Sequence, residues 1–194
     1  MARIGSVCVY CGSAGSVDER YRAGATDLGT ELGKRQIGLV YGGGRVGLMG
    51  LVADATMAAG GHVTGIIPQF LQDYEVGHHG ISELLVVDTM HTRKQAMADR
   101  SDAFIVLPGG FGTLEEFFEV LTWRQLRLHD KPIIIADIGG YWGPLVSLLD
   151  HMMAEKFARP EMKNLYSVAH SVEEIFEALA AAPAPKVDPA TKWA

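Results

Sequence analysis

Short apolar runs that alternate with longer helix-like segments constrain the fold of this chain most strongly. The runs A-F-I-V-L at residues 103–107 and P-I-I-I-A at residues 132–136 contain no polar residue. Strands of this kind are covered on both faces, as in a parallel sheet whose crossover helices lie on its two sides. The sequence therefore predicts an α/β fold, a doubly wound, Rossmann-like, mostly parallel sheet flanked by helices.

The same alternation predicts where the elements lie. Strands are expected near residues 3–10, 37–41, 62–67, 83–87, 102–107 and 132–137, with a short seventh strand near 165–169. Helices are expected near residues 18–35, 47–59, 90–100, 113–127, 141–156 and 171–181. We expect one domain over residues 1–180 and a disordered tail at residues 181–194, which lack an amphipathic period.

The charge balance and the length of the apolar runs argue against two classes of partner. Lys and Arg number 17 against 23 Asp and Glu, a formal net charge of -6 that does not suit a surface for a nucleic acid polymer. No apolar run approaches the roughly 18 residues of a membrane span. The first apolar run is broken at residues 11–13 and is too short for a signal peptide. We therefore expect a cytoplasmic protein that binds neither nucleic acid polymers nor membranes.

Two cysteines, Cys8 and Cys11, have the C-x-x-C spacing of a redox pair or of half a zinc site. On an extended strand, residues three apart point to opposite faces, and no second pair with metal-ligand spacing follows in the chain. We therefore expect two reduced structural cysteines, no metal site and no cofactor.

Glycine is in excess, with 23 residues of 194, and a first glycine-rich loop follows an expected strand. Gly42, Gly44 and Gly47 form G-x-G-x-x-G, but the next expected strand lacks the acidic residue with which a dinucleotide site holds ribose. NAD is therefore disfavoured. We expect Gly42, Gly43, Gly44 and Gly47 to cradle one phosphate through main-chain amides. The alternative is a tight turn with positive φ, which would explain one or two of these glycines.

A second glycine-rich loop, P-G-G-F-G-T-L-E-E at residues 108–116, follows the apolar run at 103–107. Thr113 is expected to be the N-cap of a helix, with Glu116 folding back in a capping box. Glu115 and Glu116 point about 100° apart on a helix, so only one of them can cap it. Capping does not account for the three glycines before Thr113, and these favour a ligand at this loop.

A basic pair, Arg93 and Lys94, lies near the start of a helix that Asp88 and Thr89 can cap. Cations at this place oppose the helix dipole, and a bound anion would reverse that cost. A solvated surface pair is an equally open alternative. Arg93 is the better candidate of the two, because its planar fork matches phosphate or carboxylate.

Together the motifs resemble those of the Lonely Guy (LOG) family of cytokinin-activating phosphoribohydrolases, once widely labelled lysine decarboxylases. The family's P-G-G-x-G-T-x-x-E is similar to residues 108–116, its G-G-G-x-x-G-L-M-G to residues 42–50, and its M-H-x-R-K to residues 90–94. The resemblance covers about residues 3–180. No lysine has a pyridoxal-type context that would support decarboxylation.

The resemblance implies hydrolysis of the N-glycosidic bond of a nucleoside 5'-monophosphate, which releases the free base and ribose 5-phosphate. It implies that Arg93 and Glu116 are the catalytic pair and that the protein is a homodimer with the pocket near the subunit interface. The implied substrate contacts are Glu75, Lys94, Gly110, Phe111, Gly112, Thr113, Leu114, Glu115 and Thr122. Ser13 and Gly109 are further candidates beside the phosphate.

The chemistry of these residues is consistent with that activity. Cleavage of a ribosyl–base bond builds positive charge on the sugar, which the carboxylate of Glu116 can stabilise while it orients hydroxyls or activates water. Arg93 can hold the phosphate or offset charge on the departing base. The expected substrates are cytokinin riboside 5'-monophosphates and AMP. The alternative is a nonenzymatic nucleotide-binding or carrier protein, because glycine loops alone specify only binding.

Overall fold

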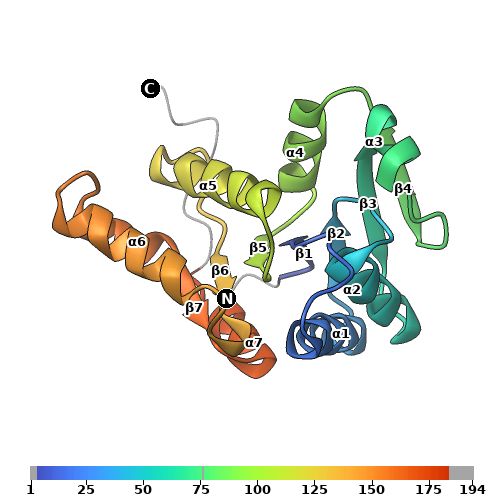
Figure 1. Ribbon diagram of the computed structural model, residues 1–194, viewed down its shortest axis with the longest axis horizontal. Helices are drawn as coiled ribbons and strands as arrows, with labels where there is room; N and C mark the ends of the chain where they lie inside the picture. The colour runs from blue at the N-terminus through green and yellow to red at the C-terminus, as the bar shows by residue number, and fades with distance from the viewer. Residues whose placement is uncertain (1–3, 76, 184–194) are drawn as a thin grey trace.

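A seven-stranded sheet forms the centre of the molecule (Figure 1). The computed structural model describes residues 4–75 and 77–183, with only the backbone of residues 73–75. The strands are β1 (Ser6–Tyr10), β2 (Gly38–Tyr41), β3 (Val63–Pro68), β4 (Glu83–Val87), β5 (Ala103–Val106), β6 (Ile133–Ala136) and β7 (Ser167–Ala169). Their order is β4-β3-β2-β1-β5-β6-β7, and every neighbouring pair is parallel. The predicted Rossmann-like α/β fold is confirmed.

Helices cover both faces of the sheet, and each face has its own apolar cluster (Figure 1). One face carries α1 (Glu19–Lys34), α2 (Gly47–Ala58) and α7 (Val172–Ala181). The other carries α4 (Met90–Asp99), α5 (Phe111–Gln125) and α6 (Gly143–Ala154). Among the described residues, no helix is long and apolar enough to cross a bilayer.

The two cysteines lie on opposite sides of the sheet, as their spacing on a strand predicts. Cys8 belongs to the cluster under α4, α5 and α6, whereas Cys11 belongs to the cluster under α1, α2 and α7. Both are buried and free.

Three short helices were not predicted from the sequence. They are α3 (Gln69–Glu75), which begins directly after β3, and the 3-10 helices η1 (Ile138–Gly140) and η2 (Pro160–Leu165). Each is too short for an amphipathic period to show. The disordered tail expected at residues 181–194 lies outside the described residues from residue 184 onward, and Ala181 is the last residue of α7.

The expected N-cap at Thr113 is wrong. The α5 helix begins at Phe111, its N-cap is Gly110 in an extended conformation, and no side chain caps it. The first helical hydrogen bond is donated by Leu114 N to Gly110 O at 3.0 Å, so Thr113 lies inside the first turn and is buried. Thr113 therefore does not occupy the N-cap position that a capping box with Glu116 requires. Thr89, in contrast, caps α4 as expected, by accepting a hydrogen bond from Thr92 N at 3.0 Å.

The strand order places a crevice at the carboxyl ends of β1 and β5. The chain runs outward from β1 to β4 and then returns to β5 on the other side of β1, so the loops after these two neighbours diverge. Ligands bind at such switch points in open α/β sheets. The two loops are pinned side by side, because Gly12 N donates a hydrogen bond to Pro108 O at 3.0 Å.

Close packing of α1 on α2 yields a first prediction. A Cβ on Gly29 would overlap the carbonyl oxygen of Val52 and lie 2.9 Å from the Cβ of Ala55. Gly29→Ala should therefore lower the free energy of unfolding by about 1–3 kcal/mol, although alanine is usually favoured over glycine in a helix. Gly143→Ala, at the first position of α6 with nothing within 4 Å, is the control and should not destabilise. Urea unfolding measures both variants. An unchanged free energy of unfolding in Gly29→Ala would contradict the close approach of α1 to α2.

His129 yields a prediction about pH. Its Nε2 donates to Val120 O at 2.9 Å and its Nδ1 accepts from Lys131 N at 3.2 Å, which requires a neutral ring. Burial lowers the pKa of His129 from 6.5 to about 4. The unfolded chain therefore binds one more proton than the folded chain between these values, so His129 costs stability as pH falls from about 6.5 to 4 and has no such effect above.

The measurement is the loss of unfolding free energy in His129→Gln relative to wild type. Because glutamine does not titrate, this loss should shrink by on the order of 2 kcal/mol between pH 7 and pH 4.5. Ser147→Ala, at an exposed residue that does not titrate, is the control and should show a difference from wild type that does not change with pH. A constant loss in His129→Gln would mean that the folded protein protonates the ring as readily as the unfolded chain does.

Candidate active site

A cavity of about 430 Å³ lies at the carboxyl ends of the central strands, a volume that suits a small-molecule ligand. It collects residues from separate loops of the sequence. The expected site residues that line it are Ser13, Gly42, Arg93, Gly110, Phe111, Gly112, Thr113, Glu115 and Glu116. The two residues of the implied catalytic pair thus meet at one cavity.

Other expected residues lie elsewhere. Gly47 lines a second cavity, and Gly109 and Leu114 line a third, more apolar one beside Tyr141 and Trp142. Thr122 is exposed on α5. The side chain of Glu75 is outside the described residues, although its backbone ends α3.

Arg93 is buried, with only 6% of its surface exposed. Its guanidinium donates from Nε to Ile66 O at 3.1 Å and from Nη2 to Gly42 O at 3.0 Å. These carbonyls lie near the ends of β3 and β2, so the strands themselves hold the arginine at the cavity wall. The alternative of a solvated surface pair is wrong for Arg93 and also for Lys94, which is equally buried.

Lys94 contacts α5. Its Nζ forms ion pairs with Glu115 Oε1 and, at 3.0 Å, with Glu119 Oε1. Burial opposes the positive charge, but the two carboxylates outweigh burial, and the pKa of Lys94 is raised above its usual value. Lys94 is therefore a fully charged link between α4 and α5.

Glu116 lies in the first part of α5 and is half-buried at the cavity. Burial, and after it the negative charge of Glu116, raises the pKa of the Cys11 thiol far above its usual value. The negative charge of Glu116 is therefore felt at the end of β1, and Cys11 lines the cavity as a neutral thiol.

The start of α5 has main-chain amides of the kind that can bind an anion. No side chain caps it, and the first amides of a helix have no acceptor within the helix, so they carry the positive end of its dipole. A Cβ at Gly110 or Gly112 would meet nothing within 4 Å, so packing does not require these glycines. A bare backbone at a helix N-terminus is suited to a phosphate.

Tyr141 holds this loop, a contact that no sequence pattern predicted. Its hydroxyl donates to Gly109 O at 2.6 Å. A Cβ on Gly109 would overlap the hydroxyl of Thr113, so this glycine is required by packing. Three apolar cavity residues, Met49, Leu71 and Met90, were also missed, because their patterns indicate only core-facing helix positions.

The first glycine-rich loop is packed against protein. A Cβ on Gly42 would overlap Nη2 of Arg93, and Gly43 and Gly47 have φ of +77° and +64°. Leu48 N, in the first turn of α2, donates to Gly12 O at 3.0 Å. Close approach and positive φ thus account for these glycines, and a phosphate cradle at this loop stays a prediction.

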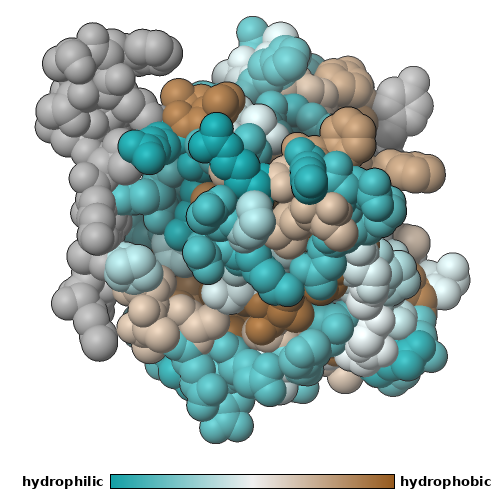
Figure 2. Space-filling model, turned by 90° about the vertical axis from the view of Figure 1, so that its left-hand side faces the viewer, coloured by the Kyte–Doolittle hydropathy of each residue, from teal (hydrophilic) through white to brown (hydrophobic). Residues whose placement is uncertain are grey.

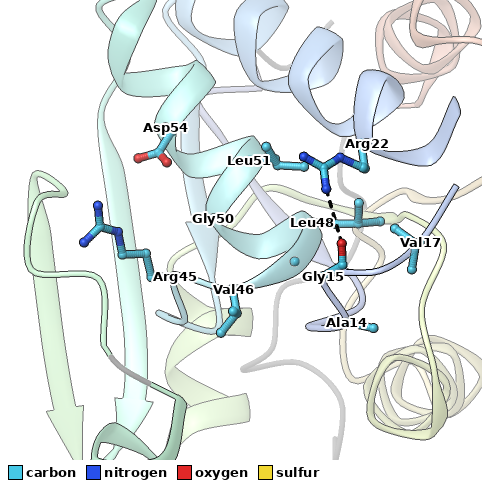
Figure 3. Close-up of a pocket in the computed structure, with 11 residues that line it drawn as sticks. Ala14, Gly15, Val17, Arg22, Arg45, Val46, Leu48, Gly50, Leu51 and Asp54 are labelled. Atoms are coloured by element: carbon cyan, nitrogen blue, oxygen red, sulfur yellow. Dashed lines mark hydrogen bonds between the residues drawn. The ribbon is translucent and has the colours of Figure 1, made fainter. Parts of the chain in front are cut away.

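The second cavity, of about 200 Å³, lies beside the start of α2. Figure 3 shows Arg22 and Arg45 on either side of this first turn, with Asp54 further along the helix. Arg22 Nη1 donates to Gly15 O at 3.2 Å.

Within residues 4–75 and 77–183, no group of three or more His, Cys, Asp or Glu is placed to hold a metal ion.

Comparisons with known proteins agree with the motifs. Residues 49–179 match a family model described as "possible lysine decarboxylase". The chain is 46% identical over 178 residues to the probable cytokinin riboside 5'-monophosphate phosphoribohydrolase LOGL2 of Oryza sativa subsp. japonica, covering 92% of this chain and 73% of that protein. It is 45% identical over 180 residues to cytokinin riboside 5'-monophosphate phosphoribohydrolase LOG5 of Arabidopsis thaliana, covering 93% and 79%. The chain belongs to the LOG family.

Solved structures share the fold of this LOG family member at lower identity. The molybdenum cofactor carrier protein of Chlamydomonas reinhardtii matches with a TM-score of 0.71 at 19% identity, covering 92% of this chain and 97% of that one. The molybdenum cofactor binding protein of Rippkaea orientalis matches with a TM-score of 0.70 at 21% identity, covering 93% and 98%. At such identity the likeness concerns the fold alone.

Proposed function

We propose that this protein hydrolyses the N-glycosidic bond of cytokinin riboside 5'-monophosphates, and of AMP, to the free base and ribose 5-phosphate. The observation that carries the proposal is the meeting of Arg93 and Glu116 at one cavity with the uncapped start of α5. Relatives about 45% identical are named for this activity. The catalytic domain would comprise residues 1–180, in a cytoplasmic protein that needs no cofactor.

The phosphate of the substrate is proposed to rest on the first amides of α5. Gly110 and Gly112 leave this backbone open, and Ser13 lines the cavity on the β1 side. The helix dipole favours a dianion there. Met49, Leu71 and Met90 give the same cavity an apolar wall that suits a purine with a prenyl substituent.

Glu116 and Arg93 have different roles in the proposed reaction. As the ribosyl–base bond breaks, positive charge develops on the sugar, and the carboxylate of Glu116 stabilises it and activates the attacking water. Two N–H groups of Arg93 are bound to main-chain carbonyls, which fixes the plane of the guanidinium. A guanidinium held in this way offsets negative charge on the phosphate or on the departing base without having to reorganise.

The test is turnover of isopentenyladenosine monophosphate and AMP by wild type and by Glu116→Gln. Wild type should release free base and ribose 5-phosphate from both. Glu116→Gln should lower kcat by about 100-fold or more, because a neutral amide does not stabilise the sugar cation. Chromatography of the products measures the rates, and thermal unfolding checks the fold.

Glu173→Gln, at an exposed position of α7, is the matched control and should retain wild-type kcat. If wild type binds both nucleotides and releases no base, the protein is a nucleotide carrier, as the alternative from the sequence holds. If Glu116→Gln turns over as fast as wild type, Glu116 has no catalytic role.

A homodimer is also proposed, and exposed apolar side chains support it. Phe111 is 94% exposed although it lines both the catalytic cavity and the apolar cavity of about 420 Å³ beside α6. Leu148 of α6 is half-exposed at the same cavity. The side of the molecule that bears α6 shows hydrophobic patches among hydrophilic residues (Figure 2). Analytical ultracentrifugation of wild type and Leu148→Glu tests this, with a dimer expected for wild type and a shift toward monomer for the variant.

A further inference from the structure

Three successive carbonyl groups in the second glycine-rich loop accept hydrogen bonds. Pro108 O and Gly110 O each accept from a main-chain amide at 3.0 Å. Between them, Gly109 O accepts from the hydroxyl of Tyr141 at 2.6 Å. Tyr141 lies between η1 and α6, far from this loop in the sequence. Of the three carbonyls, the middle one is therefore held by a side chain, whose contact a substitution can remove.

The bond to Gly109 O fixes the direction of the next amide. Gly109 O and Gly110 N belong to one peptide unit, which is trans, so the C=O and the N–H point in opposite directions. A peptide unit between two glycines is otherwise easily turned over, because glycine allows a wide range of dihedral angles. With its oxygen held by Tyr141, the unit directs the Gly110 N–H away from Tyr141. The hydrogen bond also polarises the unit, which makes this N–H a stronger donor.

The same peptide unit lies between two cavities. Tyr141 and Gly109 line the apolar cavity of about 420 Å³, whereas Gly110 lines both this cavity and the catalytic cavity of about 430 Å³. The oxygen is held from the side of the apolar cavity. The side opposite Tyr141 is therefore the one from which the catalytic cavity can use the Gly110 N–H.

The ring of Tyr141 is itself held in place. It makes edge contacts with Trp142, at 4.7 Å between ring centroids, and with Tyr21 of α1, at 5.3 Å. Trp142 is buried, and its Nε1 donates to Val106 O at 3.2 Å. Val106 ends β5, the strand that leads into the glycine-rich loop. The tyrosine is thus fixed to the strand from which this loop begins.

Building on the proposed function, we propose that Tyr141 is a positioning residue for the phosphate of the substrate. Its hydroxyl holds the Gly109–Gly110 peptide unit so that the N–H of Gly110 joins the first amides of α5 and donates to a phosphate oxygen in the catalytic cavity. Because Tyr141 acts through this one peptide unit, its hydroxyl should affect ligands that carry a phosphate and leave the others unaffected.

The experiment compares wild type, Tyr141→Phe and Tyr21→Phe by calorimetric titration with AMP, inorganic phosphate and adenosine. Phenylalanine keeps each ring and removes only the hydroxyl, so Tyr21→Phe is the matched control. In Tyr141→Phe, the Kd of AMP and of phosphate should rise about three- to tenfold, the effect of one hydrogen bond, and that of adenosine should stay within about twofold. Tyr21→Phe should match wild type with all three ligands.

Turnover of AMP separates binding from chemistry. A phosphate contact that is equally strong in the ground state and in the transition state affects KM and not kcat. In Tyr141→Phe, KM should therefore rise with the Kd of AMP, and kcat should stay within about threefold of wild type. A lower kcat at unchanged KM would place the effect on the chemical step and overturn the proposal.

Nuclear magnetic resonance reports on the amide directly. On titration of wild type with inorganic phosphate, the amide proton signal of Gly110 should move downfield, and in Tyr141→Phe it should move less at the same saturation. A Gly110 signal that phosphate leaves in place in wild type would contradict the proposal, whether or not the variant folds.

Two further results would overturn the role of Tyr141. One is a Tyr141→Phe protein that binds phosphate as tightly as wild type. The other is a variant that loses AMP and adenosine affinity by the same factor, since the hydroxyl would then only stabilise the fold. A wild type that binds AMP through Gly110 N but releases no base would support this role and contradict the proposed function. Turnover of AMP without a shift of the Gly110 signal would do the reverse.

Discussion

A buried guanidinium must have its N–H groups satisfied, and the way in which Arg93 meets this requirement organises the site. Two of its acceptors are main-chain carbonyls, Ile66 O and Gly42 O, so neither can be replaced by a change of side chain. They bring the ends of β3 and β2 together with α4. An unsatisfied charge at this depth would cost several kcal/mol, which fixes the position of α4 on the sheet.

This requirement extends into the first glycine-rich loop. Gly42 must lack a side chain because Arg93 occupies the space of its Cβ. Gly65 on β3 packs against the same loop, because a Cβ there would lie 2.8 Å from the Cα of Gly43. His78 N donates to Gly43 O at 2.9 Å and so fixes the loop from the other side. The loop is thus a packed support for the arginine.

The charges of α4 and α5 complete the arrangement. Arg93 is directed to the cavity and Lys94 to α5, although they are neighbours in the sequence. On α5, Glu116 lies at the cavity, whereas Glu119 forms an ion pair with Lys94. Glu115 lies at the cavity and also pairs with Lys94, so α4 and α5 direct charged side chains both to the cavity and to each other, and the pairing stabilises the orientation of the groups at the cavity.

Sequence patterns predicted the sheet and the loops that line the cavity because both follow from local rules. Apolar runs mark strands that are buried on both faces, and loops at the carboxyl ends of parallel strands must meet. The start of α5 was misplaced at Thr113, because the extended conformation of Gly110 does not show in residue types. The partners of Lys94 lie 21 and 25 residues away, and no periodicity within α4 reveals them.

The two glycine-rich loops show the limit of pattern most clearly, because they look alike in sequence and differ in what surrounds them. In the loop that contains Gly42, a side chain would collide with protein, so the glycines there allow other segments of the protein to pack closely against the loop. At Gly110 and Gly112 a side chain would meet nothing, so the space beside them is available to a ligand. Packing therefore favours the start of α5, rather than the loop with the more familiar G-x-G-x-x-G pattern, as the place for the phosphate of the proposed substrate.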